Sequence, residues 1–271
     1  MGPGALHVER RGFGDRAVVF LHGLGTSGFL WRHVVPALPL GRVTAYALDL
    51  FGHGESDRAV DADYSVVAQA DYLNRALTVL RVARADVVAV DFGATVALAL
   101  AAGRSSRVRS LVLVNPADPQ SPRGEDFAEL ERLSARRLLD ASRGMMGAAS
   151  LLGPVLLRSV SSPDRMPPLL IGRYVAPFVG REGVAHLMQL VRAVNDRSLD
   201  GVAWETIGVP TLVLRGDTDG WVSPAVSATI ASQLTRGEHR RVSGAARLIP
   251  EDAPSAFAEL LIGWLDVEAN R

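Results

Sequence analysis

The sequence predicts an α/β fold, in which a mostly parallel, twisted sheet carries helices on both faces and a helical cap is inserted into the chain. Short runs rich in valine, leucine and alanine alternate with segments of helical spacing up to residue 116, which is typical of parallel strands buried on both faces. The alternation stops over residues 117–203, where helical patterns are punctuated by prolines, and it resumes after them. We therefore expect a core domain from residues 1–116 and 204–271 and a helical cap, or lid, from residues 117–203.

The expected strands are short and apolar, and most are followed by a turn or a helix. They cover residues 5–10, 16–21, 43–50, 87–90, 108–114, 210–215 and 239–243. Helices are expected at residues 29–38, 64–82, 92–103, 224–235 and 254–267. In the helix at 64–82, helical spacing places a set of apolar side chains on one face, namely Val67, Ala70, Leu73, Leu77 and Leu80.

The composition excludes several kinds of chemistry. The 29 basic and 29 acidic residues cancel, so no global field favours nucleic acid or an anionic membrane. Cysteine and lysine are both absent, which excludes disulfides, thiolate metal sites and nucleophiles of either type. The sequence shows no signal peptide and no apolar run suited to a membrane span. We expect a cytoplasmic protein that binds a small, largely apolar molecule without a cofactor or metal, and its oligomeric state stays open.

The most informative stretch joins the strand at 87–90 to the helix that follows it. Asp91 stands between them, with Ala89 two residues before it and Gly93 two residues after it. A tight strand-to-helix turn needs small flanking residues and presents its apex side chain beyond the end of the sheet, as in the nucleophile elbow. Asp91 is therefore a candidate catalytic carboxylate. The alternative is an ordinary buried strand and helix with an incidental aspartate between them.

A glycine-rich stretch leaves a second interpretation open. Residues 23–28 match G-x-G-x-x-G after a strand, and Asp49 ends the next strand at a spacing suited to binding a ribose, as in dinucleotide-binding folds. Against this, Pro36 and Pro39 shorten the helix that should present its N-terminus to the pyrophosphate. A dinucleotide site also leaves the glycine loop after Asp49 unexplained, so it is the weaker alternative.

Taken together, the motifs resemble those of the α/β-hydrolase family over nearly the whole chain. Residues 22–25 (HGLG) are similar to the family's oxyanion loop, and residues 49–57 (DLFGHGESD) closely resemble its D-x-x-G-x-G-x-S-D loop. Residues 216–219 (GDTD) look like the G-x-x-D that ends the strand after the cap. The order of elbow, cap, acid and final helix also agrees with the family.

This resemblance implies roles for particular residues. The backbone N–H groups of Leu24 and Phe92, with Gly23 beside them, would form the oxyanion hole. Asp219 would be the acid that partners the catalytic histidine. Asp118, after the strand at 108–114, occupies an alternative acid position that some members use, and a loop aspartate that caps a turn is the other interpretation.

An aspartate at the apex resembles the haloalkane dehalogenase and epoxide hydrolase branch of the family. A carboxylate is already ionised at pH 7 and can attack an sp3 carbon, but the ester that forms must be hydrolysed by water that a histidine activates. The family pattern places that histidine five residues before an acidic-x-Pro motif. Residues 252–254 (DAP) fit the motif, and counting back five leads to Arg247. Arginine is always protonated in proteins and cannot serve as the base.

Other side chains are candidates for the substrate pocket. Epoxide hydrolases of this branch resemble one another in two cap tyrosines, whereas Tyr174 is the single tyrosine in residues 117–203. Dehalogenases usually follow the nucleophile with a tryptophan that binds halide, and Phe92 stands there instead. His186, in a helical pattern of the cap, could supply the missing base, although a packed or surface histidine is the alternative. Trp31 is a further candidate for substrate binding.

Three functions are compatible with these observations. In the first, the hydrolytic cycle is lost, Asp91 acts as a base or electrostatic group, and Arg247 binds an anionic oxygen. The reaction would then be a cyclisation, isomerisation, elimination or internal epoxide opening, possible in bacterial specialised metabolism. In the second, the protein hydrolyses an epoxide, halide or ester with Asp91 as nucleophile and a base from the cap. In the third, it binds a ligand without catalysis.

Overall fold

The computed structural model describes residues 4–120, 147–180, 182–195 and 197–269, together with residues 128, 130 and 132. Its strands form one sheet in the order β1-β3-β2-β4-β5-β6-β7, in which β1 pairs antiparallel with β3 and the other pairs are parallel. The expected mostly parallel sheet is thereby confirmed. The strands are β1 (Val8–Gly12), β2 (Arg16–Leu21), β3 (Val43–Leu48), β4 (Ala85–Val90), β5 (Val108–Val114), β6 (Thr211–Gly216) and β7 (Gly237–Val242).

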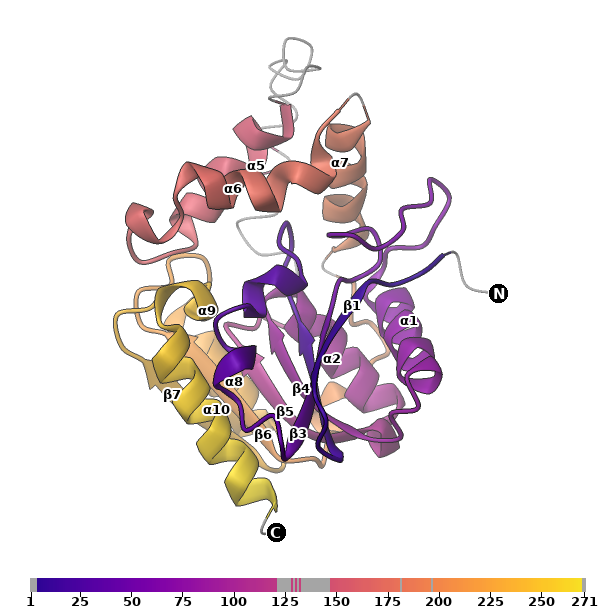
Figure 1. The fold of residues 1–271 in the computed structure, drawn as a ribbon, viewed down its shortest axis with the longest axis vertical. Coiled ribbons are helices and arrows are strands. Elements are labelled where there is room, and N and C mark those ends of the chain that lie inside the picture. The colour runs from indigo at the N-terminus through magenta and orange to yellow at the C-terminus, as the bar shows by residue number, and fades with distance from the viewer. Residues whose placement is uncertain are drawn as a thin grey trace.

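Helices cover both faces of the sheet, with α10 in front of it and α2 behind it in Figure 1. The core helices are α1 (Val66–Val79), α2 (Phe92–Gly103), α8 (Pro224–Gln233), α9 (Ile249–Asp252) and α10 (Pro254–Ala269). Short 3₁₀ turns complete the core, namely η1 (Gly28–Trp31), η2 (Val35–Ala37), η3 (Ser105–Arg107) and η6 (Trp204–Thr206). α2 is buried over nearly its whole length, which explains its run of alanine and leucine.

The cap prediction agrees with the helices between β5 and β6, which lie together above one end of the sheet (Figure 1). They are α5 (Gly147–Arg158), η4 (Pro163–Arg165), α6 (Pro168–Val175), η5 (Ala176–Phe178) and α7 (Gly183–Ala193). The limits of the cap at residues 117 and 203 stay a prediction. None of the helices in the described part of the chain combines the length and apolarity that a membrane crossing requires.

Two local expectations were wrong. The helix expected at 29–38 is a pair of 3₁₀ turns, because Pro36 lacks the N–H that a continuous helix needs. Val67 was expected on the buried face of α1 but is half exposed. Gln69 is buried instead, because its side-chain amide accepts from Phe51 N–H at 3.1 Å and donates to Phe51 C=O at 2.9 Å.

The direction of chain winding changes between β2 and β4. From β2 the chain moves to β3 on one side, and from β4 it moves to β5, β6 and β7 on the other. Ligands of open α/β sheets bind in the crevice beyond the carboxyl ends of strands at such a switch point. Leu21 pairs with Ala89, so the segments that follow β2 and β4 leave the sheet side by side. These segments are the HGLG loop and the turn at Asp91.

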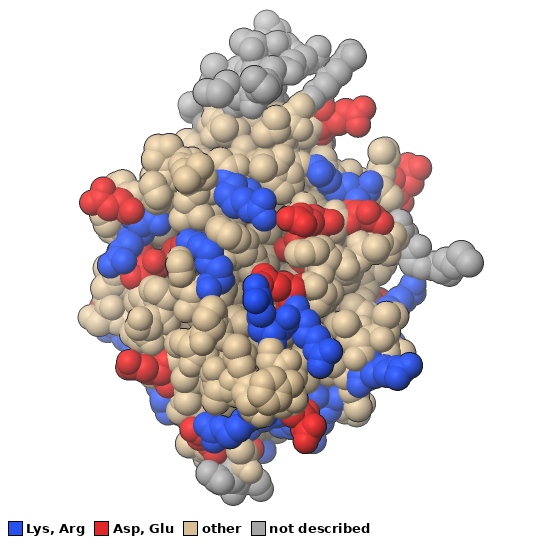
Figure 2. All heavy atoms as spheres, viewed as in Figure 1, with Lys and Arg blue, Asp and Glu red and all other residues tan. Residues whose placement is uncertain are grey.

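Charged side chains are spread over the face shown in Figure 2, where basic and acidic groups alternate instead of gathering into a patch of one sign. This distribution agrees with a formal net charge of zero.

Candidate active site

The backbone at Asp91 has the strained geometry of a nucleophile elbow. Asp91 lies between β4 and α2 with φ 54° and ψ −121°, a conformation that costs a non-glycine residue about 1–3 kcal/mol. Its N–H donates to the Val114 carbonyl at 3.0 Å, which fixes the turn to β5. A Cβ at Gly93 would lie only 2.5 Å from the His22 carbonyl oxygen, so glycine is required where α2 approaches the oxyanion loop.

Both oxygens of the Asp91 carboxylate are bound by the protein itself. The backbone N–H of Leu24 donates to Oδ2 at 3.1 Å, and Nη2 of Arg247 donates to Oδ1. A Cβ at Gly23 would lie 2.6 Å from Oδ2, so glycine there leaves room for the carboxylate. Asp91 and Arg247 are 4% and 2% exposed, and their ion pair is therefore shielded from water. Of the two expected oxyanion donors, Leu24 is thus occupied by Asp91 itself in this structure.

Asp219 lies in the same electrostatic cluster. Its Oδ1 accepts from Trp221 N–H at 2.9 Å, and its Oδ2 lies 3.5 Å from Nη1 of Arg215. Burial raises the pKa of Asp219 above its ordinary value, while the charges of Arg247 and Arg215 oppose that shift. The charged groups that act on Asp219 here are thus arginines, and its expected role as the catalytic acid stays a prediction.

The loop that carries Arg247 is fixed by Asn115, a residue that sequence reasoning did not select. The Asn115 side chain donates to the carbonyls of Ala246 and Arg247 at 3.0 and 2.9 Å and accepts from Gly216 N–H at 3.0 Å. Its φ of 43° is one that asparagine tolerates better than most residues. The sequence did contain a signal that could have selected Asn115, because it is a polar residue at the end of a buried strand and directly before a proline.

The same loop is joined to the cap. Asp252 accepts from Ala246 N–H at 2.7 Å and from the N–H and hydroxyl of Ser161, each at 2.9 Å. Leu248 N–H donates to the Ser159 carbonyl at 2.8 Å. The acidic-x-Pro motif identified Asp252 from the sequence, but not its contact with the cap. Through these bonds the position of the cap and the position of Arg247 depend on each other.

Tyr174 belongs to a second junction between core and cap. Its hydroxyl donates to Glu251, which also receives two hydrogen bonds of 2.7 Å from Arg32. Burial, with the Glu251 charge, raises the pKa of Tyr174 well above its ordinary value. The ring packs edge-on against Phe29, with centroids 6.2 Å apart. The hydroxyl is therefore bound to Glu251 here, and its proposed contact with substrate stays a prediction.

His186 and Asp118 are not hydrogen-bonded to Asp91 in this structure. Nε2 of His186 donates to the Gly52 carbonyl at 2.7 Å. Asp118 accepts from the backbone N–H of Gln120 at 2.9 Å, as an aspartate that caps a turn would. A role for either side chain in catalysis stays a prediction.

Two aromatic candidates are buried. Trp31 is 1% exposed and packs against Phe20 and Phe257, with ring centroids 5.0 and 5.9 Å away. Phe92, directly after Asp91, is 3% exposed and stacks on His53 with centroids 6.2 Å apart. Trp31 packs between β2 and α10, whereas Phe92 belongs to the elbow itself, and contact of either ring with substrate stays a prediction.

His22 fixes the oxyanion loop. Its Nε2 accepts from Leu50 N–H at 2.9 Å, and its Nδ1 donates to the Gly23 carbonyl at 2.8 Å. Burial lowers the pKa of His22, so the ring stays neutral and keeps both bonds. The bonds explain why a histidine precedes the glycine of this loop.

Asp49 joins the two glycine loops. Its carboxylate accepts from Gly28 N–H at 2.5 Å and Glu55 N–H at 2.8 Å, and it lies 3.0 Å from Nδ1 of His7. These internal bonds account for its place at the end of β3 without a ribose. Among the described residues, no group of three or more His, Asp or Glu side chains could hold a metal ion.

Comparisons with known proteins agree with this architecture. The family model of the alpha/beta hydrolase fold matches residues 16–254. Haloalkane dehalogenases from Mesorhizobium japonicum and Mycobacterium marinum are 26% and 27% identical to the chain, over 92% and 91% of it and 84% of each relative. An alpha/beta hydrolase fold protein from Burkholderia ambifaria superposes with a TM-score of 0.81 and 24% identity, covering 95% of this chain and 93% of that one. The chain therefore belongs to the α/β-hydrolase fold family.

Proposed function

We propose that this protein catalyses a non-hydrolytic reaction on a small, largely apolar substrate bound between the elbow and the cap, with Asp91 as the base or electrostatic group. The observation that carries the proposal is the direct bond between Arg247 and Asp91. At the position where the family pattern has the histidine that activates water, this chain has a permanent cation. Such a group binds anions but cannot accept the proton of a water molecule.

The geometry supports a proton transfer as the first step. A substrate carbonyl oxygen that accepts from Leu24 N–H would displace Oδ2 of Asp91, while Arg247 keeps hold of Oδ1. The released Oδ2 would then lie beside the carbon next to that carbonyl. Transfer of the proton from this carbon to Asp91 breaks a C–H bond, forms an O–H bond and leaves the electron pair as an enolate, whose oxygen the oxyanion donors stabilise.

The fate of the enolate decides the product. Return of the proton from Asp91 to another carbon gives an isomerisation, and loss of a group from the neighbouring carbon gives an elimination. Attack of the enolate carbon on an internal electrophile, such as an epoxide of the same substrate, gives a cyclisation. None of these outcomes consumes water, so none needs the histidine that is missing.

Deuterium exchange tests this proposal without knowledge of the natural substrate. A panel of small apolar ketones in D₂O should exchange deuterium next to the carbonyl in the presence of protein, as followed by mass spectrometry. The Asp91→Asn variant should lose this activity, while Asp118→Asn, an aspartate after the neighbouring strand β5, should keep it. Full deuterium exchange by Asp91→Asn would refute the role of Asp91. If the unmodified protein catalysed no exchange either, proton transfer on this class of compound would be refuted.

A hydrolase is the second candidate, because the relatives named above are haloalkane dehalogenases. In that case Asp91 attacks the halogen-bearing carbon, halide leaves, and an alkyl ester forms on Asp91. With Arg247 unable to activate water, the ester would persist, and a primary haloalkane would add one alkyl group to the intact mass of the protein. We expect no such adduct, since a haloalkane has no oxygen that could accept from Leu24 N–H and so release Oδ2 of Asp91.

The Arg247→His variant separates the two candidates. Histidine at this position faces Asp91 and lies in the field of Asp219, as a base in a hydrolytic site must. If the chain is a hydrolase that lacks only its base, the variant should release halide from haloalkanes over many turnovers. Arg247→Lys, which keeps the charge, is the matched control and should release none.

A further inference from the structure

His53 is a buried side chain with an unused hydrogen-bonding atom. Its ring is 0% exposed, and Nδ1 lies 3.3 Å from the Phe51 carbonyl, to which it donates. Within the described residues, Nε2 has no hydrogen-bond partner. A neutral imidazole that donates through Nδ1 keeps a lone pair on Nε2, so this atom is an unsatisfied acceptor. Buried polar atoms without a partner are rare in folded proteins and require an explanation.

The neighbours of His53 place it beside the candidate active site. Its ring stacks on Phe92, the residue after Asp91, with centroids 6.2 Å apart, and lies 5.0 Å from the ring of His22 in the oxyanion loop. From the cap, Phe178 meets it edge-on at 6.5 Å. His53 therefore lies where the elbow, the oxyanion loop and the cap meet, and it is not needed for any step derived above.

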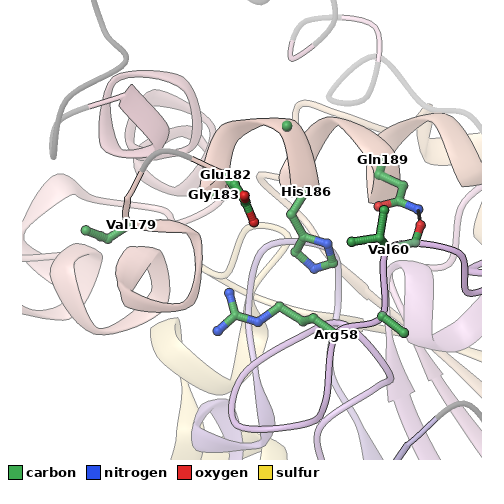
Figure 3. Close-up of a pocket in the computed structure, with 9 residues that line it drawn as sticks. Arg58, Val60, Val179, Glu182, Gly183, His186 and Gln189 are labelled. Carbon is green, nitrogen blue, oxygen red and sulfur yellow. Dashed lines mark hydrogen bonds between the residues drawn. The ribbon is translucent and has the colours of Figure 1, made fainter.

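A pocket of about 650 Å³ opens at the surface on the same side of the cap (Figure 3). It lies between the segment that includes Arg58 and Val60 and the start of α7, where Glu182 and His186 lie. In Figure 3 the His186 ring lies above the Arg58 side chain. His186 stacks on Phe178 with centroids 6.0 Å apart. A continuous line of rings thus leads from the pocket through Phe178 and His53 to Phe92.

Side-chain bonds to backbone carbonyls and the packed ring of Phe178 close the boundary between core and cap at this pocket. Arg58 donates to the Pro177 carbonyl, and Gln189 donates to the Val60 carbonyl at 2.8 Å. Rotation of these solvent-accessible side chains breaks the bonds without disturbing the sheet, and the freed groups can bond to water. With the Phe178 ring also rotated away from His53, the pocket would become a route for a small molecule towards the elbow.

We propose that His53 contacts the substrate, with Nε2 accepting a hydrogen bond from a hydroxyl or N–H group of a small aromatic or alicyclic molecule that enters through this pocket. This inference rests on the proposed substrate site between elbow and cap. The contact with His53 narrows the substrate class from any small apolar molecule to one that carries a hydrogen-bond donor opposite its reacting end. A site with a buried acceptor discriminates strongly against an analogue that lacks the donor, because the acceptor then stays unpaired.

A pair of probes of matched shape tests the inference by binding alone. 4-Methylphenol carries the donor, and 1,4-dimethylbenzene replaces it with a methyl group. In protein with ¹⁵N-labelled histidine, 4-methylphenol should shift the Nε2 resonance of His53 and bind about five- to tenfold more tightly than 1,4-dimethylbenzene. Nε2 of His22, which already accepts from Leu50 N–H, should respond equally to both probes.

The His53→Phe variant completes the test. It keeps a planar ring, and the Phe51 carbonyl still accepts from Gln69 at 2.9 Å, so we expect the variant to fold and to bind both probes equally. Preference for 4-methylphenol that survives in His53→Phe, or equal binding of both probes to the unmodified protein, would overturn the inference. Probe binding without deuterium exchange would support His53 as a substrate contact and count against the proposed reaction, so the two failures are distinguishable.

Discussion

Replacing Arg247 with methionine should lower the free energy of unfolding by about 3–5 kcal/mol, the usual cost of removing one partner from a buried ion pair. The magnitude follows from the burial of the pair, since Asp91 is 4% exposed and Arg247 is 2% exposed. Asp91, Asp219, Arg215 and Arg247 together carry no net charge. Without Arg247, a net negative charge remains away from water, and among the described residues the Leu24 N–H is the hydrogen-bond partner that Asp91 keeps.

Equilibrium unfolding in urea, followed by circular dichroism, measures this loss. The double variant Asp91→Asn/Arg247→Met removes both charges and should recover most of it, because Asp219 and Arg215 then balance each other. Asparagine has the same shape as aspartate, so the packing of the elbow is kept. The buried ion pair would be contradicted if Arg247→Met lowered the free energy of unfolding by less than about 1 kcal/mol. It would also be contradicted if the effects of the two single substitutions on that free energy simply summed in the double variant.

Two further predictions concern the oxyanion loop and the buried histidines. Gly23→Ala should abolish activity and lower the melting temperature, because its Cβ would lie 2.6 Å from the Asp91 carboxylate. The control is Gly172→Ala in α6, where a Cβ meets nothing within 4 Å and which should fold as well or better. Equal melting temperatures of the two variants would contradict the close approach of Gly23 to Asp91. Burial lowers the pKa of both His22 and His53 below 6.5, so the unfolded chain binds more protons as pH falls past that value. The free energy of unfolding should therefore decrease between pH 6.5 and 4.5, by up to about 1.4 kcal/mol per pH unit for each ring, and less steeply in His53→Phe. Urea titrations at several pH values measure the slope, and a slope unchanged by that substitution would show that His53 is not neutral in the folded state.

The strands and the elbow could be predicted because their causes are local. A short β-branched run flanked by small residues leaves few conformations for the turn at Asp91, and the structure has a positive φ there. Each of the expected strands has a counterpart in the sheet, within a few residues at the ends. The spacing to the acidic-x-Pro motif likewise selected Arg247, which bonds to Asp91 in the structure, while its role in a reaction stays a prediction.

The partners of buried side chains could not be predicted in the same way. Helical spacing indicated which face of α1 is buried, but not that Gln69 would bond to Phe51, because that bond depends on packing between distant segments. The bond from Tyr174 to Glu251 spans 77 residues for the same reason. Phe51 and Glu251 show no local pattern that identifies them as partners.

His53 illustrates a different limit. The sequence placed it in a glycine loop, where holding that loop is a sufficient role for a histidine. Only the structure shows that one ring nitrogen is used for this purpose and that the other has no partner among the described residues. A motif reveals the residue type at a position, whereas the number of bonds that the residue makes depends on its neighbours in space.

Turnover in H₂¹⁸O measures directly whether water hydrolyses an ester on Asp91. If water hydrolyses an ester on Asp91, one ¹⁸O enters its carboxylate, and the tryptic peptide of residues 85–104 becomes heavier by about 2 Da; tandem mass spectrometry then separates Asp91 from Asp86. With a substrate found by deuterium exchange, we predict that product accumulates over many turnovers while Asp91 gains no ¹⁸O. Incorporation of ¹⁸O at Asp91 in step with product would contradict the non-hydrolytic role and identify the protein as a hydrolase whose base lies elsewhere.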